Sequence, residues 1–344
     1  FIKNKKKHIF LIFILICPIT LFLVSSYKPQ LLFCITSLLV FIFLINYFPK
    51  INYQDSQKFF PLVLIILFVN SLSKFSFHLS SFLLFFYLFY LMYKKRLLRY
   101  SIFLSILTFS FLYLPYMMFR FEFFGTNLVS MIKSPLPINF YGYQSHHDLL
   151  SGGQLNIIET FFPTEILSVT TTYGPLMILI FLMINDKVKN YKIPIFLIFI
   201  YFICVFTFGS NLQRFLFEGF LWLIFLVSII FNQKSFSYKV FSKLVYLQLL
   251  VMLPLYLFFI VKIFPGSLNQ NIKKQVMIEN ANGFELASWT NEVLDKKDIL
   301  LSSHRSISLF ENKTYSDIFT WHVDLKHPDA EIYLNFLKSK KINR

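Results

Sequence analysis

Few residues of this sequence could do chemistry, and the most informative of them interrupt long apolar segments. Gln213, Arg214 and Glu218 open one such segment, and Lys74 lies between two others. Arg214 and Glu218 are four residues apart, so on a helix they share a face and could form an ion pair. An arginine at this position could equally hold a phosphate group, because its guanidinium donates two parallel hydrogen bonds to such oxygens. The sequence leaves both interpretations of Arg214 open, a self-neutralising salt bridge and a clamp for an anionic head group.

A second group of candidates lies in the stretch from residue 120 to residue 170. It contains a basic, an acidic and an amide residue and one His-His-Asp run, namely Arg120, Glu122, Asn127 and His146-His147-Asp148. Adjacent residues rarely point at one metal ion, and no further ligand has a suitable spacing, so the run favours an exposed polar turn and no metal site. The carboxylates of Glu122, Glu159 and Glu165 could serve as general bases. We expect no cofactor, with a divalent cation as the alternative left open.

Long apolar segments are the elements that must position these residues. Hydrophobic residues make up 56% of the chain, and 47 of its 344 residues are phenylalanine, more apolar surface than a water-soluble domain of this length could bury. Nearly uncharged runs of about 20 residues are typical of transmembrane helices. Nine segments of this kind are predicted, at roughly 8–26, 30–48, 59–73, 75–93, 99–119, 171–185, 191–209, 213–232 and 243–264. The expected fold class is an all-α polytopic membrane protein.

The distribution of positive charge sets the expected orientation. The formal net charge of +16 could by itself indicate nucleic acid as a partner. However, the lysines and arginines are concentrated in every second connection between the apolar segments, and such residues are retained on the cytoplasmic side of a membrane. We therefore expect a multi-pass protein of the bacterial inner membrane, with its N-terminus inside and its C-terminus outside. Its expected partners are membrane lipids and not nucleic acid.

The chain is predicted to have two parts. Residues 1–264 form the transmembrane domain, in which residues 120–170 are a long outward loop whose aromatic, proline and glycine content favours order at the membrane surface. Residues 265–344 carry similar numbers of basic and acidic residues and are expected to form an outward-facing soluble tail.

The tail is predicted to be a small α/β unit. Apolar residues at helical spacing predict a helix over 281–294, a short buried strand follows at 298–303, and a second helix is expected over 329–342. Helix, strand and helix in this order indicate a mixed layer of helix and sheet. Because the chain starts at Phe1 and stops directly after a helical stretch, we expect a fragment whose tail is truncated.

Four short motifs, in their order along the chain, carry a family resemblance. They are Ser73-Lys74-Phe75-Ser76, Leu114-Pro115-Tyr116 through Phe124-Gly125-Thr126-Asn127, Tyr173-Gly174-Pro175-Leu176, and Gln213-Arg214-Phe215. With them, most of residues 59–344 resembles the GT-C-type integral-membrane glycosyltransferases, in particular the bacterial relatives of the dolichyl-phosphate-mannose-type transferases. Two features depart from that family. Asn127 stands between Thr126 and Leu128, where the family has Gly-Asn-Pro, and the first outward loop at 25–30 lacks the family's catalytic acid.

The resemblance implies a reaction and a set of site residues. It implies inverting transfer of a sugar from a polyprenyl-phosphate donor on the outer face of the inner membrane, as in modification of a cell-envelope glycan or lipid. Residues that would contact substrate or phosphate are Arg214, Lys74, Gln213, Arg120 and Asn127. The catalytic base would lie upstream of Phe1, with Glu122 as a weaker candidate on the chain itself.

Other function classes remain open at this point. A lipid-linked-sugar flippase or transporter would need paired charges facing a cavity at membrane depth, and few charged residues occur there. A polysaccharide polymerase or ligase would also use a long outward loop, although usually one with several arginines. A non-catalytic membrane protein is the third alternative, so the sequence leaves open whether the chain is an enzyme.

Overall fold

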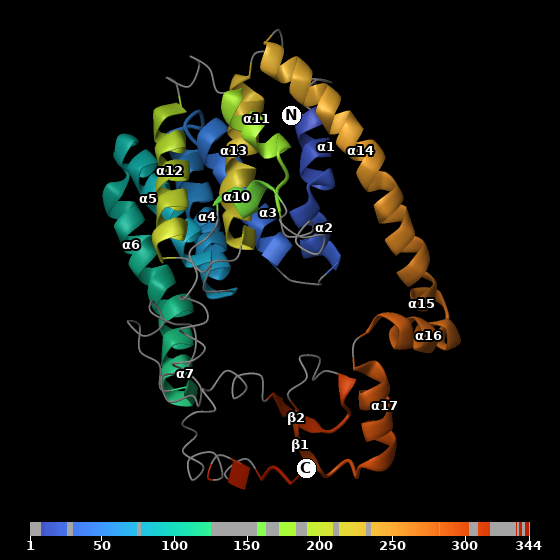
Figure 1. Ribbon diagram of the computed structural model, residues 1–344. Helices are drawn as coiled ribbons and strands as arrows, with labels where there is room; N and C mark the ends of the chain where they lie inside the picture. The colour runs from blue at the N-terminus through green and yellow to red at the C-terminus, as the bar shows by residue number, and fades with distance from the viewer. Residues whose placement is uncertain are drawn as a thin grey trace. The chain divides into compact units, whose positions relative to one another are not determined.

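A computed structural model of the chain shows a mostly helical protein (Figure 1). It describes residues 8–25, 30–73, 77–124, 157–162, 172–183, 191–208, 213–231, 235–281, 283–302, 309–316, 335, 337–338 and 341–343. These residues fall into two compact units, one with residues 8–123 and 157–251, and one with residue 124 and the residues from Met252 onward. Each unit is described by itself.

The first unit is an assembly of helices, the last of which passes into the second unit at Met252. Their bounds are α1 His8–Ile16, α2 Pro18–Ser25, α3 Gln30–Asn46, α4 Tyr53–Ser73, α5 Phe77–Lys94, α6 Leu98–Thr108, the π-helical turn η2 Phe109–Tyr113, α7 Leu114–Phe124, α10 Ile157–Phe161, α11 Leu176–Leu182, α12 Lys192–Phe208, the 3-10 turn η5 Gln213–Leu216, α13 Phe217–Ile230 and α14 Phe236–Ile263. Local chemistry explains several ends. The side chain of Asn52, for example, accepts a hydrogen bond from the backbone N–H of Asp55 at 2.7 Å and so caps the start of α4.

Among the described residues, four helices are long and apolar enough to cross a membrane, which is consistent with a membrane protein. They are Tyr53–Ser73, Phe77–Lys94, Leu98–Phe119 and Phe236–Leu268. Three shorter apolar helices accompany them within the described residues, at Gln30–Asn46, Lys192–Thr207 and Phe217–Ile230. These assignments rest on helix length and composition alone. The four candidate spans correct the nine spans expected from the sequence.

Two of the nine predicted spans fail for a local reason. The segment expected at 8–26 is divided at Cys17, because Pro18 has no N–H to continue the hydrogen-bond ladder of α1. Of the described residues 172–183 in the segment expected at 171–185, α11 is the helical part, since Gly174 takes a positive φ of 78° and Pro175 follows as the N-cap. Hydropathy measures apolar length and does not register such breaks.

Helix α13 forms the core of the first unit. Every residue from Phe217 to Ser228 is buried, and α3, α12, α1 and α11 all contact this helix. A helix that is apolar all round is typical of such a central position. Gly219 permits the close approach of α12, because a Cβ atom at this position would lie 2.6 Å from the ring of Tyr201. On the next turn, Trp222 stacks on Phe41 of α3 with ring centroids 4.9 Å apart.

The second unit contains the predicted α/β tail. After the end of α14 come α15 Pro265–Leu268, α16 Gln270–Asn280, α17 Phe284–Val293, β1 Ile299–Ser302 and β2 Lys313–Ser316. The helix predicted over 281–294 and the strand predicted at 298–303 are confirmed by α17 and β1. The strands pair in parallel, with Ile299 opposite Lys313. The helix expected over 329–342 lies almost wholly outside the described residues.

Candidate functional site

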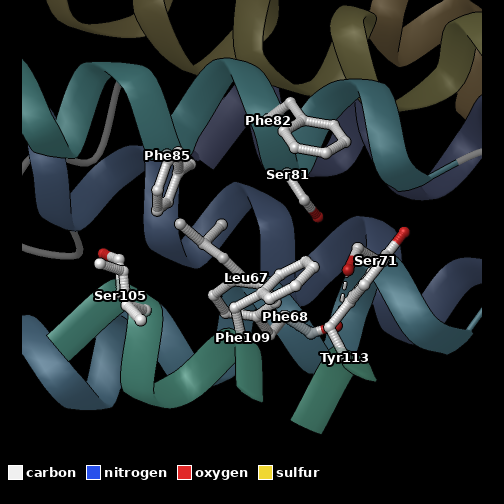
Figure 2. A pocket seen from close by; sticks show the side chains of 10 residues that line it. Leu67, Phe68, Ser71, Ser81, Phe82, Phe85, Ser105, Phe109 and Tyr113 are labelled. Atoms are coloured by element: carbon white, nitrogen blue, oxygen red, sulfur yellow. Dashed lines mark hydrogen bonds between the residues drawn. The ribbon is translucent and has the colours of Figure 1, made fainter. Parts of the chain in front are cut away.

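A cavity of about 310 Å³ lies between α4, α5 and the segment formed by α6 and η2 (Figure 2). Its wall is mainly aliphatic and aromatic, with three serines and one tyrosine: Leu67, Phe68, Ser71, Ser81, Phe82, Phe85, Ser105, Ile106, Phe109 and Tyr113. The volume lies at the lower end of the range for small-molecule sites, and such sites are mostly apolar with a few placed polar groups. The cavity is therefore the best-formed candidate for a ligand site in the described part of the chain.

Helical spacing explains how three separate segments build this wall. Leu67 and Ser71 are four residues apart on α4, and Ser81 and Phe85 have the same spacing on α5, so each pair occupies one helix face. The third wall changes its geometry within the cavity, because the chain passes from α6 into the π-helical turn η2. Such turns are rare and are frequent at functional sites.

The polar groups of the wall differ in how they are satisfied. The hydroxyl of Ser71 donates to the backbone carbonyl of Phe68 at 2.7 Å, and the hydroxyl of Tyr113 lies 2.8 Å from Nε2 of His78. The Oγ atom of Ser105 has no hydrogen-bond partner among the described residues. A buried hydroxyl without a partner is costly, so Ser105 offers a polar contact to whatever occupies the cavity.

Two apolar side chains of the cavity wall are exposed. They are Phe82 and Ile106, which are 51% and 63% exposed. Further along the same helical segment, Phe103 and Phe111 are 66% and 72% exposed. Such an outward face would be unfavourable in water but is compatible with lipid, and Leu98–Phe119 is one of the four helices able to cross a membrane. The cavity is therefore suited to a hydrocarbon chain that enters from the lipid.

The site residues expected from the sequence remain predictions. Lys74 and Asn127 lie outside the described residues, as do Glu165 and the His146-His147-Asp148 run. Arg120, Gln213 and Arg214 are placed by their backbone only, in α7 and η5. Glu122 is exposed on α7, and Glu159 lies in α10. The lining of the cavity includes none of these residues.

Glu218 has a setting that the sequence did not indicate. It lies in the first turn of α13, is only 3% exposed, and forms no ion pair with any residue that the structure describes. The partner expected for it, Arg214, has no described side chain, so that ion pair stays a prediction. The sequence signal for this setting was the presence of serines inside apolar segments, such as Ser37 and Ser80. Polar groups at membrane depth are default candidates for functional sites. Among the described residues, His, Cys, Asp and Glu form no group of three that could hold a metal ion.

Comparison with protein families assigns residues 3–344 of the chain. Residues 3–277 match the DUF1420 N-terminal domain, and residues 278–344 match the DUF1420 C-terminal domain. No curated protein and no solved structure matched the chain. The domain boundary expected from the sequence lies between residues 264 and 265. The two compact units divide at residues 251 and 252, and the two family matches meet at residues 277 and 278. The expected boundary lies between these two positions and stays a prediction. Because the two matches together cover nearly every residue, the chain belongs to the DUF1420 family.

Proposed function

We propose that this DUF1420 protein is a membrane glycosyltransferase that takes its sugar from a polyprenyl-phosphate donor. The cavity between α4, α5 and α6 carries the proposal, because its apolar wall suits one end of an isoprenoid chain. In the reaction, a bond forms between the acceptor oxygen and the anomeric carbon of the sugar. The bond from that carbon to the phosphate oxygen breaks, the acceptor proton passes to a base, and polyprenyl phosphate leaves.

The phosphate would need cationic groups near the end of the lipid chain. Lys74 comes three residues after Ser71, which lines the cavity, and it belongs to the connection between α4 and α5. Together with Arg214, Gln213, Arg120 and Asn127 it makes up the set that the resemblance to GT-C-type transferases implies. Arginine and lysine are the usual phosphate-binding residues, arginine as a bidentate donor and lysine as a point charge.

The acceptor hydroxyl would need a base within reach. Glu122 is exposed on α7, so its carboxylate is open to a substrate. Glu122 is therefore the candidate base on this chain. A general base must come within hydrogen-bond reach of the proton that it removes.

Filling the cavity should abolish binding of the donor lipid. We expect Ser105→Phe to reduce labelling by a photoactivatable polyprenyl phosphate at least about tenfold, since its ring would occupy the space of the chain. The matched control is Ser110→Phe, because Ser110 is an exposed serine of η2 outside the cavity wall. Equal labelling of the two variants, or labelled peptides that map outside α4, α5 and α6, would show that the donor does not bind in this cavity.

The orientation of the chain is part of the proposal. The concentration of lysine and arginine in alternate connections supports a cytoplasmic N-terminus and an outward C-terminal unit in the bacterial inner membrane. A pair of reporters, one active only outside and one only inside, should be fused after Phe264. We expect activity from the outward reporter alone, and activity from the cytoplasmic reporter would reverse the orientation.

A further inference from the structure

A cluster of oxygen atoms surrounds Glu218 inside the first unit, apart from the lipid cavity. The carboxyl group of Glu218 on α13 is faced by the hydroxyls of Ser37 on α3, Ser80 on α5 and Tyr201 on α12. Ser37, Ser80, Tyr201 and Glu218 are each at most 3% exposed. Residues of four helices, α3, α5, α12 and α13, thus bring one carboxylate and three hydroxyl oxygens together.

Two of these hydroxyls have already committed their hydrogen atoms. Tyr201 donates to the backbone carbonyl of Phe215 at 2.6 Å, and Ser80 donates to that of Phe77 at 3.1 Å. The hydroxyl oxygen of Tyr201 also lies 3.5 Å from Oε2 of Glu218. A hydroxyl has only one hydrogen, so neither side chain has a full hydrogen bond left for the carboxylate, and the contact of Tyr201 with Oε2 is long.

The remaining oxygens of the cluster lack partners. Oε1 of Glu218 and Oγ of Ser37 form no hydrogen bond within the described part of the chain. Burying a carboxylate without compensation is strongly unfavourable. A positive charge beside these atoms would compensate it.

The chemistry of the cluster selects the kind of positive charge. Oxygen atoms of carboxylate and hydroxyl groups are the ligands of hard cations. One carboxylate balances one positive charge, which favours a monovalent ion over a divalent one.

Among the described residues, few other charged or titratable groups lie near Glu218. Tyr201 on α12 faces Glu218 directly, and Cys34 on α3 and Tyr173 before α11 face Tyr201. These groups are neutral in their protonated forms. The N-terminal end of α13 contributes partial positive charge, which stabilises the carboxylate.

We propose that Glu218, Ser37, Ser80 and Tyr201 form a buried binding site for one alkali cation, with sodium as the expected ion. The site joins α3, α5 and α12 to the central helix α13. Occupancy therefore stabilises the packing of the first unit by mass action. The inference is independent of the proposed sugar transfer, and its test needs no activity.

Trp222 provides a reporter for the site. It lies one turn after Glu218 on α13, is fully buried, and its ring centroid is 5.4 Å from that of Tyr201. The chain has three tryptophans, so replacing Trp289 and Trp321 with phenylalanine leaves Trp222 as the only one. This full-length variant is placed in nanodiscs and titrated with sodium, potassium or choline chloride at constant ionic strength and pH.

We expect a saturable change in Trp222 fluorescence and a rise in the unfolding temperature with sodium, and neither with choline. Glu218→Gln should remove both responses. Ser37→Ala and Ser80→Ala only shorten a side chain, so these variants should fold and bind sodium roughly fivefold more weakly. The control Glu279→Gln changes an exposed carboxylate of α16 and should keep the full response.

Three outcomes would overturn the proposal. If Trp222 fluorescence and the unfolding temperature change with pH and are the same at every sodium concentration, Glu218 holds a proton and no metal ion. A sodium response that survives in Glu218→Gln would place the ion elsewhere. The absence of any alkali-ion response, together with strong destabilisation by Arg214→Ala, would identify Arg214 as the counter-ion.

Discussion

Replacing Arg214 with alanine is expected to weaken binding of polyprenyl phosphate by about 30-fold or more, because truncating one partner of a charged hydrogen-bonded pair costs about 2–5 kcal/mol. Binding of the corresponding polyprenol, which has the same chain without the phosphate, should change little. The difference between the two ligands isolates the contact with the phosphate. It is measured with the full chain in nanodiscs, by competition with the photoactivatable probe.

Two controls separate a phosphate clamp from a structural charge. Arg99 is an exposed arginine at the start of α6, so Arg99→Ala should leave both affinities unchanged. Arg214→Lys keeps the charge but loses the bidentate geometry and should give an intermediate affinity. If Arg214→Ala binds polyprenyl phosphate as the native chain does, Arg214 is not part of the donor site.

Replacing Trp222 with alanine should destabilise the first unit by about 3–5 kcal/mol, the usual cost of deleting a large buried aromatic side chain. The side chain of Trp222 is completely buried and stacks on Phe41. The change would leave a void at the centre of α13, where neighbours on α3 and α12 cannot close it fully. The loss of stability is measured by heating the protein in detergent and recording the folded fraction that remains in solution at each temperature.

Two variants sharpen this prediction. Trp289→Ala removes the same side chain from a position on α17 that is 58% exposed, and it should change stability by less than about 0.5 kcal/mol. Trp222→Phe keeps an aromatic ring and removes an indole N–H that has no hydrogen-bond partner among the described residues, so it should cost less than the alanine change. Equal unfolding temperatures for Trp222→Ala and Trp289→Ala would show that α13 is not the core.

The apolar segments could be predicted because their signal is local. The spans predicted at 75–93 and 99–119 correspond to α5 and to the helix Leu98–Phe119, since hydropathy summed over about 20 residues reports a helix long enough for a membrane. The strand β1 and the helix α17 were also predicted from short apolar patterns. The number of spans was not, because Pro18 and Gly174 break apolar segments that hydropathy treats as continuous.

The sequence by itself determined that this is a helical membrane protein with a small mixed tail, because composition and periodicity follow from residues close together in the chain. Only the tertiary structure decided that Ser71, Ser81 and Ser105 share one cavity wall. It also decided that Glu218 is buried among hydroxyls from α3, α5 and α12. Both arrangements depend on which helix faces meet, and that is set by packing between segments far apart in sequence, for which one chain read alone carries no signal.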